Sequence, residues 1–242
     1  MSVIAPVSSP RQALRLVSRP STNHEALVVL AKATGRGIGK TRLANDVGVE
    51  AAAELAEAFL ADTIALSRAS GREVTIAFTP VESRAEFSSI APEATLVAQL
   101  DGDLGERIGA ALSRALQGRG SAVLVGSDTP QLPRTVIEDA FQALKGAEMV
   151  VGPATDGGFY LIGLTAPESL TGLFDGIDWS TCRVFQQLLQ NARRLCLTVQ
   201  VLDAFTDIDD AISLAAVLRY SVDSQSAHLT RAAALRLGLE LA

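Results

Sequence analysis

The chain of 242 residues is poor in the residue types that build disulfide frameworks, metal clusters and hydrolytic triads: it has two cysteines, two histidines and one tryptophan. Cys182 and Cys196 match no metal-ligand spacing, so a disulfide framework is disfavoured and both are expected to be thiols in a reducing compartment. His24 and His228 have no neighbours that suggest a metal or a catalytic triad. A Gly-x-Ser-x-Gly motif is also missing, which disfavours acyl transfer.

Long apolar runs and positive net charge are missing as well. No run approaches the length of a membrane span, and the N-terminus has no signal-peptide core, so we expect a cytoplasmic protein without a membrane span. The net charge of -6 argues against a nucleic-acid partner. Residues 1–24 show little periodicity and are interpreted as a flexible leader, and 25–242 as a single domain with a sizeable core.

What is present is a strand-type run, beginning at Leu27, that leads into a loop rich in glycine and cations. Thr34 stands where a Walker A loop requires glycine, and the glycine spacing does not match the dinucleotide-binding fingerprint. The glycines allow close backbone approach to a ligand, and Lys32, Lys40 and Arg42 offer positive charge. The loop is therefore typical of a phosphate site, although a merely flexible basic loop is the alternative.

Strand and helix patterns alternate along the rest of the chain. Helical spacing is found at 47–70, 86–90, 104–118, 136–144, 181–192, 210–220 and 227–241. Runs of strand type occur at 73–78, 95–99, 121–126, 148–152, 159–163 and 197–202. The pattern predicts an α/β fold with a largely parallel sheet covered on both faces. The apolar helix expected at the end of the chain could pack against a second copy, so the oligomeric state stays open, with a homo-oligomer as one alternative.

Polar residues follow several of these strands, at the edge where ligands of open α/β sheets bind. Asp128 directly follows the run 121–126 and is a candidate ligand for Mg²⁺ or Mn²⁺, with a structural turn or helix cap as the alternative. Two aspartate pairs with i, i+2 spacing compete to complete such a site, and the residues alone do not choose between them. Each pair also precedes a helix, where acids are favoured by the helix dipole, so a structural role is the alternative for both. These pairs are Asp101 with Asp103 and Asp207 with Asp209.

Two further residues have more than one interpretation. Asp62 lies within the helical pattern 47–70 and is expected on its solvated face, with an orientation toward the loop as the alternative. Trp179 is expected in the core, with an aromatic wall for a ring as the alternative.

Several motifs together resemble the bacterial DUF2064 family of glycosyltransferase-like proteins, in the nucleotide-diphospho-sugar transferase superfamily, and more distantly the guanylyltransferases for molybdopterin and 2-phospholactate. The match spans about 27 to 215. The motifs are Lys32 through Leu43, Phe59-Leu60-Ala61-Asp62-Thr63, Gln99 with 102–107, Gly126 through Pro130, Gly152-Pro153, Asp156 through Gly163, Trp179-Ser180-Thr181 and Asp207-Ile208-Asp209.

The resemblance implies a GT-A-like three-layer sandwich, a nucleotide at the first loop and a divalent ion on Asp128, with Asp209 as a second metal ligand. Lys40 and Asp128 would be the catalytic residues. The residues implied in binding the nucleotide, sugar or acceptor are Ala31, Lys32, Gly37, Lys40, Arg42, Gln99, Gly102, Asp103, Ser127, Asp156, Gly157 and Gly158.

The chain differs from the family pattern at Thr34 and Arg36, where family members usually have prolines, so a more mobile loop is expected. We predict a metal-dependent glycosyltransferase-like enzyme that uses a nucleotide-sugar donor and a small-molecule acceptor. One alternative is a nucleotidyltransferase that joins a nucleoside triphosphate to a small phosphorylated acceptor. Another is a non-catalytic nucleotide-binding module, which the altered loop motivates.

Overall fold

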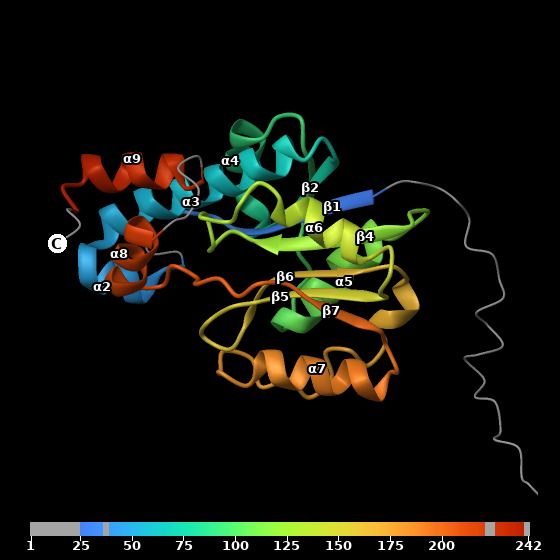
Figure 1. The fold of residues 1–242 in the computed structure, drawn as a ribbon. Helices are drawn as coiled ribbons and strands as arrows, with labels where there is room; N and C mark the ends of the chain where they lie inside the picture. Colours follow the sequence, from blue (N-terminus) through green and yellow to red (C-terminus); the bar gives the residue numbers. More distant parts are fainter. Residues whose placement is uncertain (1–24, 36–38, 221–225, 240–242) are drawn as a thin grey trace, which may run out of the picture.

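The computed structural model describes residues 25–35, 39–220 and 226–239. The expected leader, residues 1–24, lies outside the described residues, as do Arg36 and Gly37. A seven-stranded sheet with the order β3-β2-β1-β4-β6-β5-β7 forms the centre of the molecule (Figure 1). The strands are β1 (Glu25–Lys32), β2 (Glu73–Thr79), β3 (Thr95–Ala98), β4 (Ser121–Gly126), β5 (Met149–Pro153), β6 (Phe159–Leu164) and β7 (Val199–Val201).

The sheet is parallel except at β6. β1 pairs in parallel with both β2 and β4, whereas β6 lies antiparallel between β4 and β5. β6 therefore begins at the edge where the parallel strands end. Residues 154–158, which join β5 to β6, lie at the same edge as the residues that follow β1 and β4.

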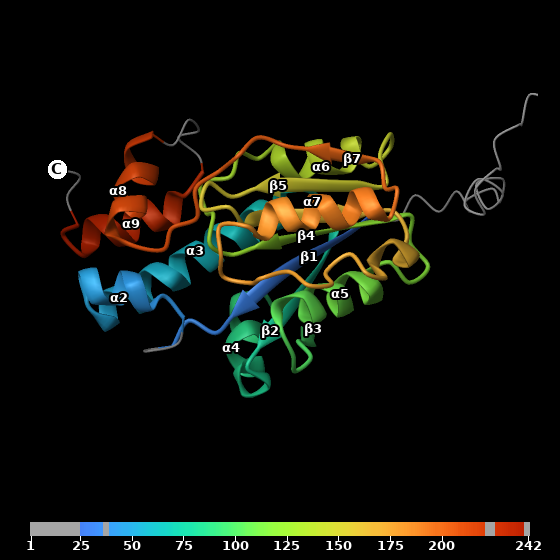
Figure 2. The same ribbon diagram turned by 90° about the horizontal axis from the view of Figure 1, so that it is seen from below.

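Helices cover both faces of the sheet, which confirms the predicted mostly parallel three-layer sandwich (Figures 1 and 2). Helices α3, α4 and α6 pack on one face, and α5 and α7 pack on the other. The helices are α2 (Thr41–Val47), α3 (Val49–Ala69), α4 (Arg84–Ile90), α5 (Leu104–Ala115), α6 (Val136–Ala143), α7 (Val184–Arg194), α8 (Ala211–Tyr220) and α9 (His228–Arg236), with short 3₁₀ turns η1 (Val81–Ser83) and η2 (Pro167–Leu170).

A third cluster of buried side chains lies at one end of the molecule, where α2, α8 and α9 pack around the first half of α3 (Figure 1). Asp62 of α3 connects this helix to α9, and the expectation that it faces solvent is wrong: it is 8% exposed. Its carboxylate accepts hydrogen bonds from the backbone N–H groups of Leu229 and Thr230, at 3.0 and 2.8 Å, and from the Thr230 hydroxyl at 2.7 Å. Asp62 thus satisfies free N–H groups at the start of α9.

Several predicted boundaries need correction. The helix expected over 47–70 is divided at Gly48, whose φ of +91° interrupts the helical backbone, and α2 precedes it. α7 begins at Val184, later than the helix expected from 181, and Ser180 before it has a left-handed φ of +62° that is not helical. Among the described residues, no helix has both the length and the apolar character that crossing a membrane requires.

Candidate functional site

A cleft with a volume of about 710 Å³ opens at the edge of the sheet where the parallel strands end. Residues that follow β1 and β4 line it, together with the start of β6, the segment 179–182 and two aspartates from 207–209. These segments are far apart in the sequence. The expectation that polar residues after several strands lie in one place therefore agrees with the geometry of this edge.

The centre of the cleft is an ion-paired lysine. Lys40 Nζ lies 3.0 Å from Asp128 Oδ1 and 2.9 Å from Asp209 Oδ1, and its side chain is only 12% exposed. Arg42 contacts the other oxygen of Asp209 at 2.7 Å. Of the two aspartate pairs that the sequence left open, the pair at 207–209 joins Asp128.

The environment keeps Lys40 charged. Burial alone lowers the pKa of the Lys40 ammonium, but the charges of Asp128 and Asp209 and its hydrogen bonds to them raise the pKa above its ordinary value overall. Lys40 is thus a fixed cation between two carboxylates.

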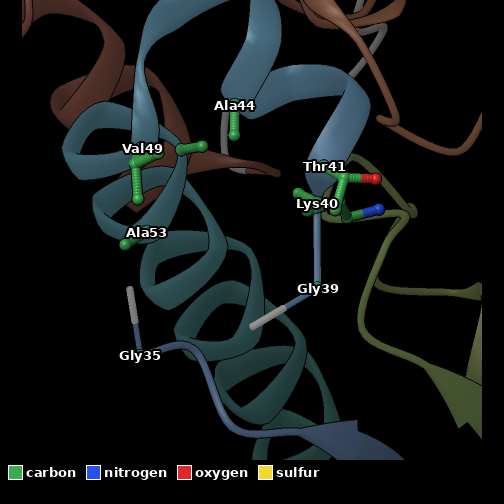
Figure 3. Close-up of a pocket in the computed structure, with 8 residues that line it drawn as sticks. Gly35, Gly39, Lys40, Thr41, Ala44, Val49 and Ala53 are labelled. Carbon is green, nitrogen blue, oxygen red and sulfur yellow. The ribbon is translucent and has the colours of Figure 1, made fainter. Parts of the chain in front are cut away.

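Lys40 owes its position to the short segment that enters α2. Gly39, at φ +104°, turns the backbone just before Lys40, and α2 begins one residue later. Figure 3 shows the Lys40 amine directed away from Val49 and Ala53 of α3. A hollow of about 30 Å³, which is room for about one water, lies on that other side between Gly39 and α3.

Asp207 is the acid that the sequence left without a role, although it also lines the cleft. Burial raises the pKa of the Asp207 carboxyl to about 6, and repulsion from Asp128 and Asp156 adds to the effect. Its hydrogen bond from the Thr129 hydroxyl, at 2.6 Å, and the charge of Lys40 act in the opposite direction. The i, i+2 spacing between Asp207 and Asp209 is the sequence feature that made Asp207 a candidate for the site.

The raised pKa of Asp207 predicts a pH dependence of folding stability. Between about pH 4 and pH 6 the folded state binds this proton more tightly than the unfolded state, so the contribution of Asp207 to stability falls as pH rises through about 6. We expect Asp207→Asn to be more stable than the wild type at pH 7.5 by about 2 kcal/mol, and to differ little at pH 4. Melting curves of both proteins in EDTA measure this difference, and a difference independent of pH contradicts it.

The residues present fit a divalent ion without forming a preformed cage. Across the described ranges 25–35, 39–220 and 226–239, no three or more His, Cys, Asp or Glu side chains are grouped to hold a metal. Mg²⁺, however, is commonly held by one or two carboxylates together with substrate phosphates and water. Asp128 and Asp209 already share one cation, the Lys40 ammonium, so their oxygens suit such an ion.

The residues expected near the nucleotide divide into two groups. Lys32, Gln99 and Ala31 line the cleft, and the Gln99 amide donates to the backbone carbonyls of Ala31 and Ala77 at 2.9 and 2.8 Å. Gly102 and Asp103 do not line it. Asp103 instead caps α5 in a capping box with Glu106, which agrees with the structural alternative for that pair.

The turn between β5 and β6 brings Asp156 and Gly158 to the cleft, and Ser127 lies there beside Asp128. Gly157 does not line it but has a clear packing role. It has a φ of +94°, and a side-chain carbon there would lie 2.2 Å from the carbonyl oxygen of Cys182. Only glycine lets this turn approach the segment 179–182 so closely.

The start of the loop after β1 is held in place rather than loose. Thr34 is buried, and its backbone N–H and hydroxyl both donate to Glu86 Oε1, at 3.1 and 3.0 Å. A residue expected to make the loop more mobile thus anchors its first part to α4. Arg36, the other departure, is not described.

Comparisons with known proteins agree with this geometry. A family model described as an uncharacterized protein conserved in bacteria (DUF2064) matches residues 62–181. A solved structure from Desulfovibrio desulfuricans G20, provisionally named a nucleotide-diphospho-sugar transferase, is 30% identical, with 89% of this chain and 95% of that chain covered and a TM-score of 0.80. No curated protein matches the chain.

Two more distant structures share the fold. Rv0371c from Mycobacterium tuberculosis H37Rv, solved as a complex with manganese, is 17% identical over 81% of this chain and 99% of that chain, with a TM-score of 0.53. A CMP-2-keto-3-deoxy-manno-octonic acid synthetase complexed with CTP is 13% identical over 80% and 96% of the two chains, with a TM-score of 0.51. The comparisons confirm the expected transferase class and the match to the DUF2064 model, and the 30% identity over nearly the whole length shows that the chain belongs to the same family as the Desulfovibrio nucleotide-diphospho-sugar transferase structure.

Proposed function

We propose that the protein is a glycosyltransferase-like enzyme that binds a nucleotide-sugar donor in the cleft together with Mg²⁺ or Mn²⁺. The observation that carries the proposal is the Lys40 ammonium between Asp128 and Asp209, at the edge of the sheet where the fold places ligands. A catalytic role for Lys40 and Asp128, and a role for Asp128 and Asp209 as metal ligands, are parts of this proposal.

The cations around β1 would bind the phosphates of the donor. Lys32 and Arg42 are exposed along the cleft, while Lys40 is fixed by its carboxylate partners. A divalent ion on Asp128 and Asp209 would add positive charge where the leaving phosphate becomes more negative. Because Lys40 now lies between these carboxylates, binding of the ion would release its ammonium to the phosphates.

Nucleotidyl transfer is the second candidate, and the three cations Lys32, Lys40 and Arg42 favour it because they suit a triphosphate. A relative in fold also binds CTP. The other part of the cleft, which is aromatic and apolar and includes Phe159 and Trp179, favours the first candidate, since it leaves room beyond the phosphates for a sugar.

A thermal-shift panel tests the proposal. Nucleoside triphosphates and nucleotide sugars are added separately, with and without Mn²⁺ or Mg²⁺. A ligand at about 100 times its Kd stabilises the folded state by about 2.7 kcal/mol, which raises the melting temperature of a protein of this size by about 5–10 °C. We expect a metal-dependent shift with nucleotide sugars that Asp128→Ala loses.

Asp101→Ala is the matched control, because Asp101 is an exposed aspartate that does not line the cleft. A shift with triphosphates alone would select nucleotidyl transfer. Binding without turnover across a broad acceptor panel would select the non-catalytic module. An unchanged shift in Asp128→Ala contradicts the assigned metal ligand.

A further inference from the structure

We infer that Trp179, Ser180 and Asp156 form a subsite for a carbohydrate ring, the donor's sugar or the acceptor. The inference rests on the proposed function but is carried by a separate part of the cleft. The cleft is charged around Lys40, while its other lining residues include the apolar side chains of Leu104, Ile108 and Phe159 beside Trp179.

Trp179 is a firmly placed aromatic wall. Its ring lies 6.4 Å from that of Phe159 in an edge-to-face arrangement and 6.2 Å from that of Phe174. The first turn of α5 also supports it, because a side-chain carbon at Gly105 would lie only 2.7 Å from the Trp179 ring. Trp179 packs against the core cluster, as expected, but it is also partly exposed and lines the cleft, so the alternative of an aromatic wall stays open as well.

The segment that carries Trp179 is held by a network around Asp178. The Asp178 carboxylate accepts a hydrogen bond from the Gln187 side-chain amide and forms an ion pair with Arg183, both at 2.9 Å. Its backbone carbonyl accepts from the Thr181 hydroxyl at 2.7 Å. The wall is thus ordered before any ligand arrives, which lowers the entropy that binding costs.

Three polar groups of this cleft have no hydrogen-bond partner among the residues that the structure describes. In the part of the chain that the structure describes, neither the Trp179 indole N–H nor the Ser180 hydroxyl has a hydrogen-bond partner. Asp156 accepts from the Gly158 N–H through Oδ1 at 2.9 Å, which leaves its Oδ2 without a partner among the same residues. All three groups belong to residues that line the cleft.

This combination matches the chemistry of a carbohydrate. The C–H bonds of a sugar ring carry partial positive charge and attract the negative face of an aromatic ring. The hydroxyls at the rim of the sugar need donors and acceptors, which Ser180, Asp156 and the indole N–H supply. Ser180 also holds a left-handed φ of +62°, a backbone conformation that is strained for a residue with a side chain.

Trp179 is the one tryptophan of the sequence, so tryptophan fluorescence reports on this subsite alone. UDP-glucose is compared with UDP, and GDP-mannose with GDP, in the presence of Mn²⁺. In a second arm, methyl glucoside, methyl mannoside and myo-inositol are titrated with UDP and Mn²⁺ present. A change in emission with the sugar conjugate but not with its nucleoside diphosphate assigns the subsite to the donor, and a change in the second arm assigns it to the acceptor.

Gly105→Ala is expected to move the indole and weaken carbohydrate binding by about tenfold, with nucleoside diphosphate binding unchanged. Gly109→Ala is the matched control on the same helix, because its added carbon would meet Phe174 at an ordinary 3.7 Å. Asp156→Asn replaces the carboxylate that would accept from a sugar hydroxyl and leaves the packing of Trp179 unchanged. It should also weaken carbohydrate binding.

The outcomes separate this inference from the proposed function. If the nucleotide sugars raise the melting temperature but no carbohydrate in either arm changes the emission, the subsite is wrong and the proposed function stands. An equal change with the nucleoside diphosphates alone would mean that a nucleobase stacks on Trp179, which also overturns it. If carbohydrates change the emission but the protein binds no nucleotide, the result supports the subsite and contradicts the proposed function.

Discussion

Lys40→Met is expected to reduce turnover by about 10²–10³-fold and, in the opposite direction, to strengthen Mn²⁺ binding in the absence of nucleotide by about tenfold. The loss follows because Lys40 is the buried cation that the donor's phosphates would meet. The gain follows because its ammonium already neutralises Asp128 and Asp209 at 3.0 and 2.9 Å, and the ion must compete with it. Electron paramagnetic resonance of free Mn²⁺ measures the second effect without any catalysis.

Lys145→Met serves as the control for Lys40→Met, because Lys145 is exposed on the surface and does not line the cleft. It should leave both turnover and Mn²⁺ affinity unchanged. Weaker Mn²⁺ binding in Lys40→Met would mean that Lys40 supports the metal site rather than competing for it. Unchanged turnover would show that Lys40 is not a catalytic residue.

Asp62→Ala is expected to have the largest effect on stability, with a loss of about 3 kcal/mol in the free energy of unfolding. The substitution leaves two backbone N–H groups and one hydroxyl at the start of α9 without their shared acceptor. For a chain of this size the loss lowers the melting temperature by about 6–12 °C. Trypsin should also cut faster at Arg231 and Arg236 of α9.

Glu57→Ala provides the comparison for Asp62→Ala, since Glu57 is an exposed acid on the same helix. Its expected change is within about 0.5 kcal/mol. A loss below about 1 kcal/mol in Asp62→Ala would show that water replaces the carboxylate at little cost.

Most of the fold could be predicted from the sequence because its strands are short apolar runs that stop at distinctive polar residues. The strand predicted over 121–126 is β4, with the same first and last residues, and Asp128, which comes shortly after it, lines the cleft. Alternation of strand and helix patterns was enough to predict a covered, mostly parallel sheet. The reversed direction of β6 was not predicted, since its apolar run is the same for either direction.

The parts of the site that sequence patterns did not resolve depend on contacts between distant residues. Periodicity placed Asp62 on a helix but carried no information on α9, the element it binds. Spacing gave the pairs Asp101–Asp103 and Asp207–Asp209 equal weight, and only the packing of the chain brings the second beside Lys40. The raised pKa of Asp207 likewise comes from burial and from neighbours that are remote in the sequence.

The bond between Lys40 and Asp209 joins residues 169 positions apart, and this separation has a consequence for folding. The antiparallel pair β5–β6 is joined by a short connection and is expected to form on the microsecond timescale of hairpins. Contacts between distant residues carry a larger loop-closure entropy and form later. The Lys40–Asp209 pair is therefore among the last contacts to form, and the proposed nucleotide site is complete in a chain still being synthesised only after β7 and the segment that follows it have left the ribosome.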